Sequence, residues 1–196
     1  MKTQATAARR KSAGTRTSAR ARLLAAADEL FYENGINLVG IDRVIEHAGV
    51  AKASLYDCFG SKEELIRAYL KGRADRRQAR ISERIAGLGT PQEKILGVFD
   101  LLAEIVTRTD YRGCAFQRAS AEAGASSVIK GTCEEPRSWL RSLFTELTRQ
   151  AKAADPELLG RQLMFLYDGA ALAASVDGDR NAPQAARVLA AQMMPS

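Results

Sequence analysis

Apolar positions repeat every three or four residues along most of this chain, which is the period of an amphipathic helix. One face of an expected helix over 18–34 carries Leu23, Ala26, Ala27, Leu30 and Phe31. No run of strictly alternating apolar and polar residues lies between turn signals, so strands are not expected. The pattern predicts an all-α fold of nine or ten helices.

Capping residues predict where these helices begin and end. Gly35 should end the first helix, because a left-handed C-cap is cheap for glycine. Ser61 with Glu64, and Thr90 with Glu93, have the spacing of capping boxes. The other expected helices lie at 41–48, 52–59, 61–85, 90–109, 114–123, 128–153 (kinked at Pro136), 156–176 and 183–193.

Charge is concentrated in the first part of the chain. Residues 1–80 contain 16 Lys and Arg against 9 Asp and Glu, whereas residues 81–196 contain 13 against 14. Residues 1–17 have no apolar periodicity, so we expect a mobile basic arm there. The basic first part suggests a polyanionic partner, with a merely solubilising surface as the alternative.

Other functional classes lack support in the sequence. The three cysteines are far apart, without the spacing of metal ligands, and favour a reduced, cytoplasmic protein. No stretch approaches the ~18 apolar residues of a membrane span, so no membrane partner is expected. No catalytic, metal-binding or phosphate-binding motif is present, so neither an enzyme activity nor a cofactor is expected.

Residues 41–59 have the layout of a helix-turn-helix. Gly49 supplies the turn between two short helices, and four apolar residues lie where the helices would face each other: Val44, Ala48, Val50 and Leu55. The outward face of the second helix is polar or small. Any helical hairpin with a glycine turn would share part of this pattern, so the pattern alone leaves both interpretations open.

A longer set of residues closely resembles the tetracycline-repressor (TetR) family. The resemblance covers about Arg20 to Leu70 and rests on matches at fixed spacing. These are Arg22–Ala27, Leu30-Phe31, Gly35, Ala48-Gly49-Val50, Leu55-Tyr56, Phe59 and Ser61–Leu65. Beyond Leu70 only the helical layout matches, although residues 112–116 look like a segment of one branch of the family.

The resemblance implies an all-α homodimer with a DNA-binding head over 18–65 and an effector-binding and dimerisation body over 66–196. The helix at 52–59 would enter the major groove of a double-stranded operator. Tyr56 and Lys62 would contact the DNA backbone, and a ligand in the body would weaken operator binding. We therefore expect a DNA-binding transcriptional regulator, most simply a repressor released by a small hydrophobic ligand.

The expected DNA-binding residues include departures from the family pattern. The candidates are Gly40, Lys52, Ala53, Ser54, Tyr56, Asp57 and Lys62. Gly40 and Ala51 replace capping hydroxyl residues, and Ile45 replaces a small alanine. Asp57 would repel phosphate but accept a hydrogen bond from cytosine N4. The sequence therefore predicts how the head docks, and leaves the operator sequence open.

Two expectations concern the body. Candidate effector contacts are Leu102, Val106, Cys114, Phe116, Gln117, Trp139, Phe165 and Asp168, with a solid core as the alternative. Of two apolar stripes, one can face the body's own core, and small residues from Gly169 to Ala174 would let a second helix approach closely, giving a four-helix seam with a second copy. The stripes are Leu140, Leu143, Phe144 and Leu147, and Leu159, Leu163, Leu166, Ala170 and Ala174.

Two competing classes remain at this point. One is a helical ligand-binding protein or enzyme with a vestigial DNA-binding head. The other is an architectural protein that binds DNA without sequence preference. Salt-dependent binding to a defined upstream site would favour the regulator over both.

Overall fold

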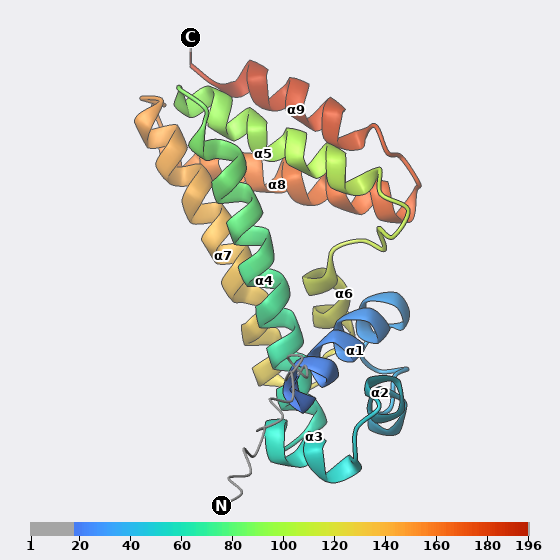
Figure 1. The fold of residues 1–196 in the computed structure, drawn as a ribbon. Coiled ribbons are helices and arrows are strands. Elements are labelled where there is room, and N and C mark those ends of the chain that lie inside the picture. The colour runs from blue at the N-terminus through green and yellow to red at the C-terminus, as the bar shows by residue number, and fades with distance from the viewer. Residues whose placement is uncertain (1–17, 196) are drawn as a thin grey trace, which may run out of the picture.

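Helices are the regular structure of residues 18–195, the part of the chain that this computed structural model describes (Figure 1). They are α1 (Ala19–Asn34), α2 (Ile41–Ala48), α3 (Lys52–Phe59), α4 (Lys62–Ala86), α5 (Pro91–Val106), α6 (Ala115–Glu122), α7 (Ser127–Gln150), α8 (Pro156–Val176) and α9 (Ala182–Met193). The expected all-α class is confirmed. The basic arm expected at 1–17 lies outside the described residues.

The head is built on α1, α2, α3 and the beginning of α4, at one end of the molecule (Figure 1). Leu23, Val44, Leu55 and Leu65 are completely buried there, one from each helix. Each fully buried leucine or valine contributes about 1.5–3 kcal/mol relative to an exposed one. This shared core sets the positions of the two short helices of the expected helix-turn-helix.

The long helix α4 joins the head to the body (Figure 1). Its first half packs into the head core through Tyr69 and Leu70, and its second half reaches the body core through Ile81. Helix α6 also packs on the head core, through Phe116 and Ala119. The boundary between the two hydrophobic cores therefore lies within α4. It does not coincide with residue 65, where the sequence predicted that the DNA-binding head ends.

The body core lies between α4, α5, α7, α8 and α9. Phe99 and Phe144 stack with their ring centroids 5.9 Å apart, and Tyr167 meets both rings edge-on. Gly160 of α8 lies directly against Thr145 of α7, where there is no room for a side chain. No helix of the described chain is long and apolar enough to cross a membrane.

One of the two expected capping boxes is complete. The Thr90 hydroxyl accepts from the Glu93 N–H at 3.2 Å, and Glu93 accepts from the Thr90 N–H at 2.8 Å. Ser61 accepts from the Glu64 N–H at 3.1 Å, but Glu64 does not reach back. Its carboxylate binds the guanidinium of Arg67 one turn later, which offers the stronger charge-assisted bond. The prediction that Glu64 would also accept a hydrogen bond from the backbone N–H of Ser61 was therefore wrong.

Candidate DNA-binding site

A tight turn at Gly49 sets the angle between α2 and α3. Gly49 has φ 61° and ψ 42°, a left-handed conformation that suits glycine. Its N–H caps α2 through the carbonyls of Ile45 and Glu46. The Gly49 carbonyl accepts from Nη1 of Arg22 at 3.1 Å, so α1 holds the turn in place. The sequence predicted the turn at Gly49 but did not indicate this hydrogen bond from Arg22.

The second helix presents one buried and one exposed face. Leu55 points into the head core, whereas Lys52, Ala53 and Asp57 are exposed and Ser54 is half-buried. The Tyr56 side chain is 45% exposed. The structure therefore brings the five expected α3 residues to an accessible face, on a helix whose inner face is locked by packing.

Lys52 has a partner that the sequence did not indicate. Its ammonium lies 3.0 Å from Oδ1 of Asp42 in the first turn of α2. This hydrogen bond, together with the attraction of the carboxylate, raises the pKa of Lys52. Both side chains are mostly exposed, so the pair is weak and can exchange for a DNA contact.

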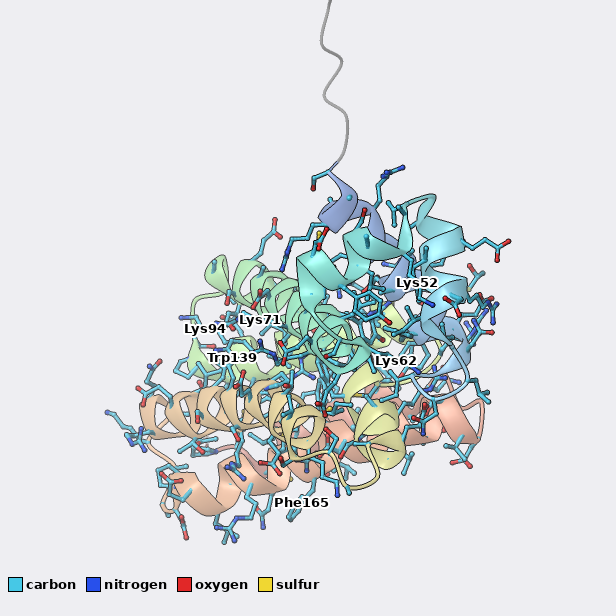
Figure 2. All side chains as sticks on the ribbon, turned by 90° about the horizontal axis from the view of Figure 1, so that it is seen from below. Lys52, Lys62, Lys71, Lys94, Trp139 and Phe165 are labelled. Carbon is cyan, nitrogen blue, oxygen red and sulfur yellow. The ribbon has the colours of Figure 1, made fainter. Side chains whose placement is uncertain are left out.

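Lys62 is the first residue of α4 and lies on the head together with Lys52 (Figure 2). It is half-buried, and burial lowers its pKa, while the carboxylate of Glu122 opposes that change. Gly40 and Ala51, at the N-caps of α2 and α3, make no side-chain capping bond, as their residue types predict. Both helix N-termini therefore keep backbone N–H groups free of a side-chain cap, and such groups bind phosphate well.

The expected effector residues do not come together around one cavity. Leu102 and Val106 are buried in the body core, and Phe116 is buried in the head core. Cys114, Gln117 and Trp139 are half-buried. Phe165 is 61% exposed and projects from the outer side of α8, away from Trp139 (Figure 2). Phe165 therefore lines no pocket with Trp139, because it faces outward on its helix.

Asp168 shows how the fold accommodates a carboxylate on a largely apolar helix. It forms an ion pair with Arg137 of α7. Burial raises the pKa of Asp168, and the neighbouring Arg137 opposes that increase. The pairing satisfies the requirement that a partly buried charge have a partner.

The two apolar stripes expected at a dimer seam face inward within a single chain. Their buried members are Leu140, Phe144, Leu147, Leu159, Leu163, Ala170 and Ala174. Other apolar residues are exposed: Leu158, Phe165, Leu172 and Val176, which share one face of α8 by their helical spacing, and Val188 and Leu189 on α9. Both stripes, rather than one of them, therefore belong to the chain's own core, because α7 and α8 cover each other, and the four-helix seam stays a prediction.

These features define a helix-turn-helix protein with a separate helical body, and relatives of known class share them. The model of the tetR family of bacterial regulatory proteins matches residues 23–69. The crystal structure of a TetR-family transcriptional regulator from Streptomyces coelicolor has a TM-score of 0.78 and 30% identity, covering 88% of this chain and 96% of that one.

Two curated relatives match the first part of the chain. The repressor KstR2 of Mycobacterium tuberculosis is 33% identical over 87 residues, 44% of each protein. The activator FasR of Mycolicibacterium smegmatis is 42% identical over 60 residues, 31% of this chain and 27% of FasR. The match thus spans less than half the length of these relatives. The chain belongs to the TetR family, whose members are transcriptional regulators rather than enzymes.

Proposed function

We propose that this protein is a transcriptional repressor that binds a double-stranded operator as a homodimer. The observation that carries the proposal is the accessible face of α3, presented by a helix-turn-helix whose inner side is fully packed. In this proposal residues 18–65 bind DNA, and residues 66–196 dimerise and respond to a small ligand. Similarity to KstR2, a transcriptional repressor, supports repression. Similarity to FasR, a transcriptional activator, leaves activation as the alternative.

The residues of the head divide into two roles. Tyr56 and Lys62 hold the phosphates, because a phenol on the accessible face of α3 and an ammonium at the start of α4 suit backbone anchoring. Lys52, Ser54 and Asp57 are the candidates for base contacts, with Ala53 allowing close approach of the helix to the groove floor. Gly40 contributes through the backbone at the start of α2.

Lys62→Ala should weaken binding to operator and to random DNA by the same factor. The lost contact is to phosphate, which every sequence presents, so the slope of log affinity against log salt should flatten by about one. Fluorescence anisotropy at several salt concentrations measures both quantities.

The matched variant is Ser54→Ala, on the outward face of α3. It removes a hydroxyl without changing charge, so it should alter the preferred operator sequence and leave the salt slope unchanged. If Lys62→Ala lost operator binding but kept its affinity for random DNA, the phosphate role of Lys62 would be refuted.

We also propose that a drug-sized hydrophobic ligand weakens operator binding by favouring a body conformation that separates the heads. Coupling of this kind is reciprocal, so operator DNA should weaken ligand binding by the same factor. Leu102, Val106 and Phe116 are buried in filled cores, so such a ligand must displace side chains to enter. Trp139, Cys114 and Gln117, which are half-buried, are the residues that can move most readily.

Trp139→Leu tests this role with hydrophobic compounds that release the wild-type protein from operator DNA. The variant should keep its fold and its operator affinity but lose its ligand response. Phe165→Leu is the control, because that side chain faces outward and should leave the response unchanged. An undiminished response in the Trp139 variant would exclude this site.

A further inference from the structure

A cleft of about 510 Å³ lies between three parts of the chain: α1 of the head, the middle of α4, and the end of α5 with the segment that follows it. Its size falls within the range of small-molecule sites, roughly 300–1,000 Å³. The charged side chains of its lining are four arginines and two aspartates: Arg73, Arg76, Arg80, Arg108, Asp28 and Asp110. The cleft therefore has an excess of cationic groups, although none of the DNA-binding candidates belongs to it.

The two aspartates leave part of this positive charge unmatched. Asp28 accepts from both Arg73 (Nε at 2.9 Å) and Arg76 (Nη2 at 2.5 Å), so one carboxylate serves two guanidinium groups. Arg108 pairs with Asp110 at 2.8 Å. Arg80 pairs with no carboxylate of residues 18–195, and its Nε reaches only the Arg76 carbonyl at 3.4 Å. Arg80 is thus the cation of the cleft most available to a ligand.

Aromatic and apolar surfaces stand beside these cations. The guanidinium of Arg73 lies 3.6 Å from the ring centroid of Tyr32, a cation–π contact that holds both groups in place. The Tyr111 hydroxyl donates to the Ala171 carbonyl at 3.1 Å, which fixes the second ring of the lining. Ala79 and Ile105 complete the apolar part. Rigid aromatic walls with a few charged groups suit a flat ligand that carries an anionic group.

The cleft also spans the joint between head and body. Asp28 and Tyr32 belong to α1, whereas Arg108 and Tyr111 follow α5. Tyr32 already connects the two parts, because its hydroxyl donates to the Gly113 carbonyl at 3.1 Å and accepts from the Arg112 N–H at 3.0 Å. A ligand held from both sides would change how strongly the head is tied to the body.

We propose that this cleft binds a small organic anion, a carboxylate or a phosphate on a flat apolar group, and that binding there alters operator affinity. The cleft shares no residue with the hydrophobic ligand site proposed around Trp139, and it would bind an anionic rather than a neutral hydrophobic ligand. Binding itself is independent of the proposed DNA-binding function, and only its regulatory consequence rests on that function. Arg80 and Arg76 hold the anionic group, and Tyr111 with Ala79 contacts the flat group.

Calorimetry on the full chain without DNA tests the site, with 1-naphthoate and phenyl phosphate as the anionic probes and 1-naphthalenemethanol as the neutral one. At least one anionic probe should bind more tightly than the neutral one, and Arg80→Gln should lower its affinity by about tenfold, as expected for losing a charged hydrogen bond. Preference for naphthoate or for phenyl phosphate distinguishes a carboxylate from a phosphate ligand.

Two further variants make the result decisive. Arg141→Gln removes an exposed arginine of α7 that is not part of the cleft and should leave binding unchanged. Ala79→Phe, at an exposed position, should block the cleft without disturbing the core. The proposal is overturned if neither anion binds, if the neutral probe binds equally well, or if the Arg141 variant loses as much affinity as the Arg80 variant.

A parallel measurement of operator binding with and without the bound anion separates the two proposals. An altered operator affinity in wild type, absent in Arg80→Gln, supports regulation through the cleft. An anion that binds without altering operator affinity overturns the regulatory part. Failure to bind any operator would instead refute the proposed function while leaving the calorimetric result intact.

Discussion

Leu172→Asp should convert the protein into a monomer and lower its operator affinity by more than about 100-fold. Leu172 is 53% exposed on α8, within the apolar face that includes Phe165 and Val176. A contiguous apolar face of this kind is typical of an interface between copies of a chain. A charge buried there without a partner would cost about 3–5 kcal/mol.

The loss of operator affinity follows from geometry. A dimer binds two half-sites, and the second contact forms at high effective concentration, which is worth about 10²–10⁴ in affinity. The half-sites should form a near-palindrome with centres separated by about 34 Å or a multiple of it. Separate monomers keep each α3 contact but lose this advantage, so a single half-site should be bound equally well by variant and wild type.

Sedimentation velocity at micromolar concentration measures the state of association. Val128→Asp is the matched control, because Val128 is an exposed apolar residue at the start of α7, outside the apolar face of α8. It should remain dimeric and keep its operator affinity. A wild-type protein that sediments as a monomer at micromolar concentration, yet binds the operator fully, would refute dimerisation.

The second large effect is expected from Gly160→Ala, which should destabilise the body by about 3 kcal/mol, near the upper end of the range for overpacking. A β-carbon at this position would lie 2.5 Å from Oγ1 of Thr145 and 2.9 Å from its Cα and N atoms. The hydroxyl can rotate away, but the backbone of α7 cannot move without separating the two helices. The substitution should therefore weaken the core between α7 and α8.

Urea unfolding at a fixed protein concentration measures the change in the free energy of unfolding. Gly131→Ala is the control, because the residue is inside α7 and the added carbon would have no atom within 4 Å apart from its chain neighbours and the nearby backbone of its own helix. Alanine favours a helix over glycine by about 1 kcal/mol, so this variant should be unchanged or more stable. Equal stability of the Gly160 variant and wild type would show that α7 and α8 can separate at little cost.

The sequence was sufficient for the elements of the head. Helix and turn are local structures, so the apolar spacing around Val44 and Leu55 and the glycine at position 49 predict α2 and α3 with the bounds observed. Caps such as Thr90 with Glu93 are equally local. Two ends differ by three residues, since α5 ends at Val106 rather than 109 and α7 at Gln150 rather than 153, and several others differ by one residue. Periodicity does not show where the last turn ends.

Only the tertiary structure decided which surface each helix face meets. Periodicity groups Leu159, Leu163 and Ala170 on one face of α8, but whether that face meets α7 or a second copy depends on contacts distant in sequence. The same reason explains why Phe165 faces outward, why Arg22 holds the turn at Gly49, and why arginines of α4 meet α1 across a cleft. The sequence by itself thus determined the helices and the helix-turn-helix motif, while packing between distant segments determined the cleft and the apolar residues that stay exposed on α8.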